Sequence, residues 1–246
     1  MLKRSFTLIE MVIVIVLLGV VSSIGIGLLV VVFNGYIDSK NLFYLFYEAK
    51  FGVERIDREL RESIPNSVYV STDNLSVTFV KFSGGSFYKK MSGDKIIVGE
   101  DNVTIFVGDN LSIYNDNVDS IYNSSSCVNT DNSSRVYRIV EKNSDNYTLC
   151  KNIVIDSPIM KFYIIDEVVT FKKENNNLLR CSSKNFTQKP ATENCYLFIK
   201  NLADISFKYQ QQSLFINDQI IDIYLEMSKN NVKLPYKHKV HVRNTP

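Results

Sequence analysis

The chain has 246 residues, and its 28 lysines and arginines nearly balance its 26 aspartates and glutamates, which gives a formal net charge of +2. Such a balance argues against a nucleic-acid-binding protein, because contact with phosphates needs a clustered basic surface. The length allows one large domain or two small ones, but nearly all of the strongest hydrophobicity lies in the first 33 residues.

The first predicted element is a membrane-spanning helix. No charged residue occurs between Met11 and Phe33, and a helical run of about 23 residues covers the ~30 Å hydrocarbon core of a bilayer. A soluble cytoplasmic protein is thereby excluded. Lys3 and Arg4 are the only cations before the run, so we expect a cytoplasmic N-terminus and an extracytoplasmic bulk. An ordinary secretion signal is disfavoured, because its apolar region is only about 7–15 residues long.

A short basic leader precedes the span. Residues 5–10 read Ser-Phe-Thr-Leu-Ile-Glu and run directly into the apolar stretch, and this motif resembles the N-terminus of type IV prepilins and pseudopilins. The resemblance implies that a membrane-embedded prepilin peptidase cuts the Ser5–Phe6 bond on the cytoplasmic side and methylates the new N-terminus at Phe6. Ser5 stands where the family usually has Gly, and it keeps the position small.

Glu10 is an acid at the edge of an apolar span. A carboxylate held at the membrane centre costs about 2.5–3.5 kcal/mol on insertion scales, so we expect it to need a cation. The resemblance implies one, the ammonium group of Phe6 on a neighbouring subunit, and such a pair favours correct register more than raw stability. The alternative is that Glu10 lies solvated among the lipid headgroups.

Gly19, Ser23 and Gly27 recur at a spacing of four within the span and so share one helix face. Small residues at this period let helices approach closely in lipid, which predicts a packing groove for neighbouring stem helices. Small residues are also common in membrane helices generally, and the two interpretations carry equal weight.

The helix is expected to continue past the membrane and to end near residues 62–64, because Pro65 disfavours helix at Ile64. Apolar residues there keep a spacing of three and four, and charged residues fill the other faces. The apolar positions are Leu42, Leu45, Phe46, Ala49, Val53, Ile56 and Leu60, and the charged ones, expected to form a solvated face, are Lys50, Glu54, Arg55, Asp57, Arg58, Glu59 and Arg61.

Short β-branched and aromatic runs separated by turns follow Pro65. The predicted strands cover residues 68–70, 75–80, 95–98, 103–107, 136–140, 153–155, 161–165, 167–171, 205–209, 220–227 and 239–242, with turns at 83–85, 92–94 and 108–110. Asn230-Asn231 predicts a hairpin, and the Asn-, Asp- and Ser-rich segment 109–134 is expected to be a long exposed loop.

The expected fold class is therefore α+β and pilin-like, with one long N-terminal helix packed on an antiparallel β-rich head. The domain organisation follows from the same boundaries. It comprises a leader (1–5), the transmembrane half of the stem helix (6–33), its amphipathic half (34–64) and an extracytoplasmic head (65–246).

All four cysteines, Cys127, Cys150, Cys181 and Cys195, lie in the expected extracytoplasmic part. An even count in an oxidising compartment favours two disulfides, and the ligand spacing of a zinc site is absent. Proximity in sequence suggests Cys127–Cys150 and Cys181–Cys195, which is one of three possible connectivities. Four free thiols are the alternative.

Catalytic signatures are lacking in the sequence. His238 and His241 are the only histidines, and at a spacing of three on a strand they point to opposite faces. There is no Gly-rich phosphate loop and no nucleophile elbow, and Asp116, Asn117 and Asp119 do not match a calcium-binding loop. We expect a non-enzymatic protein with no metal and no cofactor.

Three later stretches, 58–68, 157–171 and 238–246, resemble the large minor pilins of the mannose-sensitive haemagglutinin (MSHA) system. The resemblance implies a minor pilin that is held in the inner membrane, moves to the pilus, and joins an initiation or tip complex. Its partners would be prepilin peptidase, the membrane, and other major and minor pilins. The alternatives are a minor pseudopilin of a type II secretion system and a membrane-anchored periplasmic binding or adhesive domain.

Overall fold

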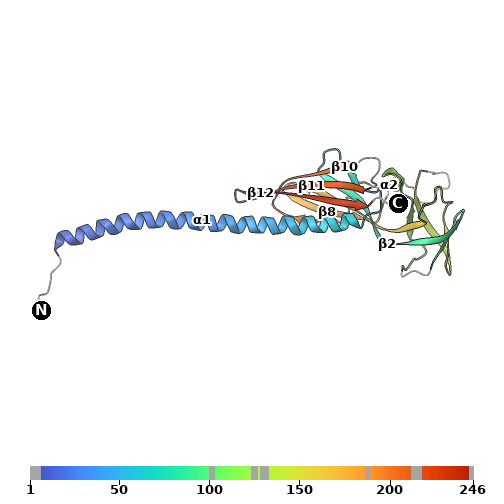
Figure 1. Ribbon diagram of the computed structural model, residues 1–246, viewed down its shortest axis with the longest axis horizontal. Helices are drawn as coiled ribbons and strands as arrows, with labels where there is room; N and C mark the ends of the chain where they lie inside the picture. The colour runs from blue at the N-terminus through green and yellow to red at the C-terminus, as the bar shows by residue number, and fades with distance from the viewer. Residues whose placement is uncertain are drawn as a thin grey trace.

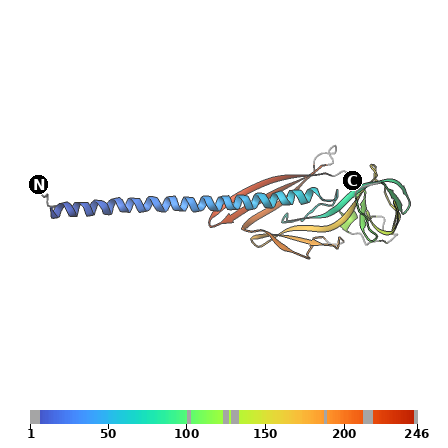
Figure 2. The same ribbon diagram turned by 90° about the horizontal axis from the view of Figure 1, so that it is seen from below.

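The computed structural model describes residues 7–99, 103–122, 127, 133–186, 189–211 and 218–243. A single long helix, α1 (Leu8–Arg61), runs out of a β-rich head, and only its C-terminal half contacts that head (Figure 1 and Figure 2). The expected α+β plan, a long helix on an antiparallel head, is confirmed.

The helix α1 has 54 residues, which corresponds to a length of about 81 Å. Its apolar N-terminal half makes no contact with the head, and it is long and apolar enough to cross a membrane. In the second half, Leu45, Ala49, Val53 and Ile56 are completely buried against the head. The helix ends at Arg61, just before the predicted boundary at residues 62–64.

The buried face of α1 differs from the predicted one at its margins. Leu42 and Phe46, predicted to pack on the head, are 42% and 39% exposed, because they lie beside the buried positions Asn41 and Leu45 at the margin of the contact face. Gly52 is buried instead. Glu59 was expected on a solvated face and is only 5% exposed, because a partner from the head meets its carboxylate.

The head contains twelve strands and one short helix among the described residues. Their bounds are β1 (Tyr69–Val70), β2 (Ser76–Ser92), β3 (Lys95–Val98), β4 (Asn110–Ile113), α2 (Asp119–Tyr122), β5 (Val136–Asn143), β6 (Asn146–Leu149), β7 (Lys161–Glu174), β8 (Asn177–Ser183), β9 (Tyr196–Ile199), β10 (Leu202–Gln211), β11 (Asp218–Lys229) and β12 (Val232–Arg243).

Two sheets enclose the C-terminal half of α1. The smaller sheet has the order β10-β11-β12, and the larger contributes β2, β7, β8 and β9 to the same core. The helix contacts β12, β11, β9 and β2. The stem therefore packs into the head along one face and leaves its opposite face exposed.

The larger sheet closes on itself beyond the end of α1. The strand β2 pairs with β3 through its C-terminal end and with β7 along most of its length, so the order β2-β3-β6-β5-β4-β7 returns to β2. Its interior is a separate apolar core that includes Tyr88, Leu111, Tyr137 and Phe162. Figure 1 and Figure 2 place this distal barrel past the end of the stem, on the side away from the N-terminus.

Several strand boundaries differ from the prediction. The segment 83–85 was expected to be a turn but continues β2, and register shifts absorb the bend. Gly85 is needed there because a Cβ would lie 3.0 Å from the Phe162 carbonyl oxygen. Segments 161–165 and 167–171 merge into the single strand β7, while 103–107 and 153–155 form no strand.

The segment 109–134 was predicted as an exposed loop, and its described part contradicts this. It contributes β4 and α2, and Leu111, Ile121 and Tyr122 are fully buried. The Tyr122 hydroxyl donates to the Ser67 carbonyl, 2.8 Å away. The prediction was wrong because it used the average composition of the segment, which is polar. The few apolar residues in it nevertheless reach the core.

The two glycine- and asparagine-based turns agree with the prediction. Gly93 has φ +63° in the β2–β3 turn, and Asn230 and Asn231 have φ 49° and 66° in the β11–β12 hairpin. Both asparagines thus adopt the left-handed conformation that a two-residue hairpin turn requires.

Candidate functional site

The N-terminal end of α1 carries the predicted assembly acid. Ser5 and Phe6, the predicted cleavage bond and methylation site, lie outside the described residues. Glu10 lies in the first turn of α1 with its side chain exposed, and the next charged residue along the chain is Asp38. Between residues 7 and 37, Glu10 is thus the only charged side chain, and it lies at the helix N-terminus, where the helix dipole favours negative charge.

The predicted small-residue stripe lies on the same uncovered part of α1. At Gly19 and Gly27 an added Cβ would meet no atom within 4 Å, so both positions are open to a neighbouring helix. The Ser23 hydroxyl donates to the Val20 carbonyl at 2.8 Å, which satisfies it within its own helix. The packing role of the stripe stays a prediction.

An aromatic surface on α1 was not predicted from the sequence. We define the aromatic face as Tyr36, Phe43, Tyr44, Tyr47 and Phe51, which are all exposed on α1. The Lys229 ammonium of β11 lies 4.0 Å from the centroid of the Tyr44 ring, at the border with the head. Tyr47 and Phe51 are stacked, with ring centroids 6.2 Å apart. The sequence could have predicted this surface, because these aromatic residues recur at helical spacing and lie on a different helix face from the buried residues.

The aromatic face continues onto the head as a shallow apolar groove. Leu197 and Phe198 of β9 line this groove together with Tyr44, Tyr47 and Phe51. Leu197 is exposed, whereas Phe198 is partly covered by the Arg55 guanidinium, 5.3 Å from its ring centroid. The apolar surface of the stem therefore extends well beyond the length that a bilayer covers.

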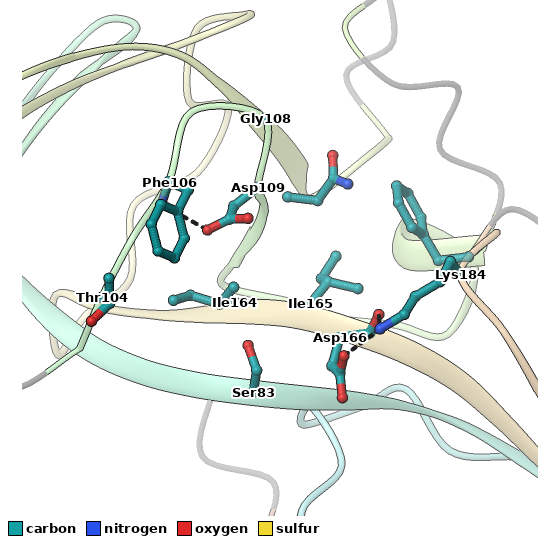
Figure 3. Close-up of a pocket in the computed structure, with 11 residues that line it drawn as sticks. Ser83, Thr104, Phe106, Gly108, Asp109, Ile164, Ile165, Asp166 and Lys184 are labelled. Carbon is teal, nitrogen blue, oxygen red and sulfur yellow. Dashed lines mark hydrogen bonds and ion pairs between the residues drawn. The ribbon is translucent and has the colours of Figure 1, made fainter.

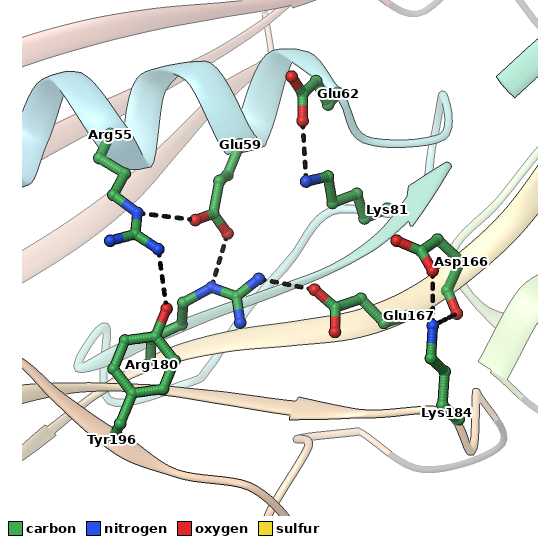
Figure 4. A network of polar contacts seen from close by, with 9 residues as sticks. All are labelled: Arg55, Glu59, Glu62, Lys81, Asp166, Glu167, Arg180, Lys184 and Tyr196. Atoms are coloured by element: carbon green, nitrogen blue, oxygen red, sulfur yellow. Dashed lines mark hydrogen bonds and ion pairs between the residues drawn. The ribbon is translucent and has the colours of Figure 1, made fainter. Parts of the chain in front are cut away.

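A buried ionic network joins α1 to the head (Figure 4). Arg180 of β8 donates through Nε to Glu59 of α1 at 2.8 Å and through Nη2 to Glu167 of β7 at 2.7 Å. Arg55 bonds Glu59 at 3.3 Å and the Tyr196 hydroxyl of β9 at 3.0 Å. The network thus connects α1 to β7, β8 and β9 at the same position along the helix.

The charge state of Arg180 follows from this geometry. Burial alone would lower the pKa of its guanidinium, but the hydrogen bonds to Glu167 and Glu59 outweigh burial and raise the pKa above its ordinary value. Arg180 is only 7% exposed, so its charge is compensated by the two carboxylates rather than by water. The arrangement is suited to holding the helix in place, not to proton transfer.

A cavity of about 370 Å³ lies between the distal barrel and the end of β8 (Figure 3). The charged side chains that line the cavity form hydrogen bonds or ion pairs with neighbouring residues. Asp166 pairs with Lys184 at 2.5 Å, and Asp109 accepts from the Phe106 amide at 2.8 Å. The remaining polar side chains that line the cavity are those of Ser83, Thr104 and Asn110.

The four cysteines form two disulfides, Cys127–Cys150 and Cys181–Cys195, which are the pairs suggested by proximity. Within the part of the chain that the structure describes, no group of His, Cys, Asp and Glu has the arrangement of a metal site. His238 lies 3.7 Å from Asp57 on the α1 side of β12, and the His241 side chain is exposed.

The comparisons with known proteins concern the N-terminus. A family model described as the prokaryotic N-terminal methylation motif matches residues 1–26. No curated protein and no solved structure matches the chain significantly. The matched motif continues into a helix that is apolar and uncovered, and it implies processing by a prepilin peptidase. Together these findings support a protein of the type IV pilin and pseudopilin family, anchored in a membrane by α1.

Proposed function

We propose that the protein is a minor type IV pilin of the MSHA type, comparable to the biogenesis protein MshO. Cleavage of the Ser5–Phe6 bond and methylation of Phe6 produce the mature chain. The stem then anchors it in the inner membrane with the head in the periplasm, until it joins a pilus initiation or tip complex. Its role is structural and not catalytic.

The observation that carries this proposal is the exposed apolar surface of α1 outside the expected membrane region. Residues 11–33 suffice to cross a bilayer, yet the aromatic face continues to Phe51. Large contiguous apolar surfaces on soluble parts of proteins mark interaction sites. Lateral contact with other pilin stems would cover this surface, whereas a simple membrane anchor would leave it in water.

The position of Glu10 supports the same conclusion. It is the only acid in the first turn of α1 and lies four residues after Phe6. In an assembled bundle, the methylated ammonium of Phe6 from an adjacent subunit would neutralise the carboxylate. Because an unpaired charge in an apolar bundle is costly, this pairing would select one axial register between neighbours.

The size of the head favours a minor pilin over a major one. The distal barrel is a second core beyond the part that holds the stem. The three stretches that resemble MSHA minor pilins map to the end of α1 with the segment that leads to β1, to β7, and to the end of β12. These elements hold the stem or connect it to the head, so the resemblance concerns the architecture and extends beyond the leader.

Mass spectrometry of the mature N-terminus tests processing. The expected product begins with N-methylated Phe6, and a chain that keeps Met1 in cells with active prepilin peptidase would contradict the proposal.

Assembly is tested with Glu10→Ala, measured as recovery of the protein in sheared filaments. We expect a decrease of more than about a hundredfold, since leaving one member of a buried pair uncompensated costs about 3–5 kcal/mol. Glu54→Ala is the matched control, because Glu54 is a half-exposed acid of the same helix. Equal recovery of the two variants would remove the assembly role of Glu10.

A minor pseudopilin of a type II secretion system is the second candidate, because the N-terminal motif supports it equally. Deletion of the gene separates the two functions. Loss of surface pili with normal protein secretion supports the pilin, and the reverse result supports the pseudopilin.

A further inference from the structure

The Cys181–Cys195 disulfide lies next to the ionic network that holds the stem. Cys181 directly follows Arg180 on β8, and Cys195 directly precedes Tyr196 on β9. Arg180 and Tyr196 are cross-strand partners, and the guanidinium lies 5.7 Å from the tyrosine ring centroid. The covalent bond thus joins the two strands one position away from both groups that contact α1.

Four side chains form a closed ring of contacts at this point. Arg55 binds Glu59, Glu59 binds Arg180, Arg180 lies against Tyr196, and the Tyr196 hydroxyl accepts from Arg55. Two members come from α1 and two from the strands that the disulfide joins (Figure 4). Displacement of β9 would therefore open the ring on two sides.

Besides the disulfide, β9 is held by the packing of Ile199 and Phe198 in the core of the stem and by a short ladder with β8. It is a four-residue edge strand, and its ladder with β8 has only three partner pairs and a register shift. The loop before it is attached to β8 separately, through hydrogen bonds from Ser182 and Ser183 to Glu193 at 3.1 and 2.7 Å. Without the disulfide, the loop keeps its own bonds, but Tyr196 loses its covalent tie to the strand that carries Arg180.

We propose that the Cys181–Cys195 disulfide, with Arg180 and Tyr196, forms a clamp that fixes the last two turns of the stem helix to β8 and β9, so that this end of the stem is fully held only after the head has been oxidised. Closing the bond removes two electrons and two protons from the two thiols and transfers them to a disulfide oxidant, which becomes a dithiol. Reduction by a dithiol reverses the step and loosens β9 from α1. The link to assembly rests on the proposed function, but the clamp itself does not.

The two disulfides of the chain provide a matched comparison. Cys127–Cys150 closes a loop of similar size, with a separation of 23 residues against 14, but Cys150 follows β6 of the distal barrel and joins no strand that contacts α1. The double variants C181S/C195S and C127S/C150S therefore differ in whether the lost bond borders the stem, and also in burial, because Cys181 is fully buried whereas Cys127 and Cys150 are partly exposed.

Hydrogen–deuterium exchange of the full chain in detergent micelles tests the clamp without requiring assembly. In C181S/C195S, we expect amides of residues 55–61 and 196–199 to exchange at least about tenfold faster than in the wild type, because local opening becomes easier. In C127S/C150S, the same amides should keep their wild-type rates. Unchanged exchange in C181S/C195S, or equal acceleration in both variants, overturns the proposal.

Exchange in the distal barrel shows whether the head is still folded. If amides of residues 136–149 also lose protection in C181S/C195S, the disulfide supports the whole head and the clamp is overturned.

Arg180→Met, which keeps the disulfide, should accelerate the exchange of the same stem amides. Arg180→Lys should keep part of the wild-type protection, since lysine keeps the charge but not the two-armed geometry. Arg138→Met, at an exposed position of β5, is the control and should leave exchange in the stem unchanged.

The assembly consequence is measured separately, as recovery in sheared filaments. C181S/C195S should fall by about tenfold or more relative to C127S/C150S, and equal recovery would show that the clamp does not act on assembly. If the mature N-terminus is not methylated Phe6, the proposed function fails, while the exchange result still decides whether the clamp exists.

Discussion

Glu59 shows how one side chain decides the orientation of the stem. Its neighbours in sequence, Arg58 and Leu60, point to solvent and to the core respectively, and helical geometry places Glu59 at the boundary between them. Arg180 reaches it from β8 at 2.8 Å, so its carboxylate is buried with a partner. Removing either partner would leave a buried charge with one of its two ionic partners, Arg55 for Glu59 or Glu167 for Arg180, which is more costly than losing an exposed ion pair.

Gly52 allows the closest approach between α1 and the head. A Cβ at this position would clash with the Ile199 side chain, with Cγ1 only 2.7 Å away. We expect Gly52→Val to lower the free energy of unfolding by about 1–3 kcal/mol through overpacking. Chemical denaturation of the head measures the effect. Gly35→Val is the control, because an added Cβ there meets no atom within 4 Å, and equal destabilisation by both variants would contradict the close approach.

Buried tyrosines make the head sensitive to alkaline pH. Burial raises the pKa of Tyr122 and Tyr137, and burial together with the hydrogen bond to Asp156 raises the pKa of Tyr88. A group whose folded pKa exceeds its unfolded value keeps its proton in the folded state, so stability falls as pH rises above about 10.

We therefore expect the free energy of unfolding in urea to decrease steeply between pH 9 and 11. Tyr122→Phe should reduce this pH dependence, because one titrating group is removed, although it loses the bond to Ser67 and lowers stability at pH 8 by about 1 kcal/mol. An identical pH slope in the two proteins would show that Tyr122 does not contribute.

At the scale of elements, the long strands β2 and β7 organise the head. Each runs through both cores, since the N-terminal part of β2 and the C-terminal part of β7 face the stem, and their opposite ends belong to the distal barrel. The register shifts near Phe82 and Gly84 mark the passage between the two regions. A β-bulge is a usual way to bend a strand between two packing environments.

The β11–β12 hairpin gives a prediction at the same scale. Asn231 has φ 66°, a conformation that costs a residue with a Cβ about 1–2 kcal/mol unless its side chain compensates. Asn231→Gly should therefore stabilise the protein by up to about 1 kcal/mol, and Asn231→Ala should destabilise it by about 1 kcal/mol. Thermal unfolding of both variants checks the prediction, and a shift in the same direction for both would contradict the left-handed turn.

At the scale of the whole molecule, the stem has two functional halves with different surroundings. Its N-terminal half is uncovered on every side, while its C-terminal half is enclosed by two sheets but keeps the aromatic face open. This division lets the head hold the helix firmly without obstructing its outward surface. The clamp at Arg180 borders the aromatic face, because Arg55 lies over Phe198 of the groove.

Substitution of the aromatic face should separate folding from assembly. Tyr47 and Phe51 are 54% and 65% exposed, so the double variant Tyr47→Ser/Phe51→Ser should change the stability of the isolated chain by only about 0.5 kcal/mol. We expect its recovery in sheared filaments to fall by about tenfold or more, since buried aromatic residues dominate protein interfaces. The control is Lys50→Ser/Arg58→Ser on the same helix, and equal recovery of both double variants would exclude a contact role for the aromatic face.

The sequence by itself determined the long apolar stem, its end near Pro65, the β-rich head, and the turns at Gly93 and Asn230-Asn231. Each of these features depends on a local property of the chain. The stem follows from an uncharged apolar run, its end from the restricted backbone angles before proline, and the turns from residues that tolerate positive φ. The leader motif is equally local, and the family model detects it on residues 1–26.

Only the tertiary structure decided which residues meet across the chain. Glu59 and Arg180 are 121 positions apart, and the sequence around either residue does not indicate that the two form a pair. The closure of the distal barrel depends on β2 pairing with two strands at once, and the burial of Tyr122 depends on a carbonyl group at Ser67. Long-range pairing is set by how all elements pack together, so the physical reason for these features becomes visible only when the whole chain is folded.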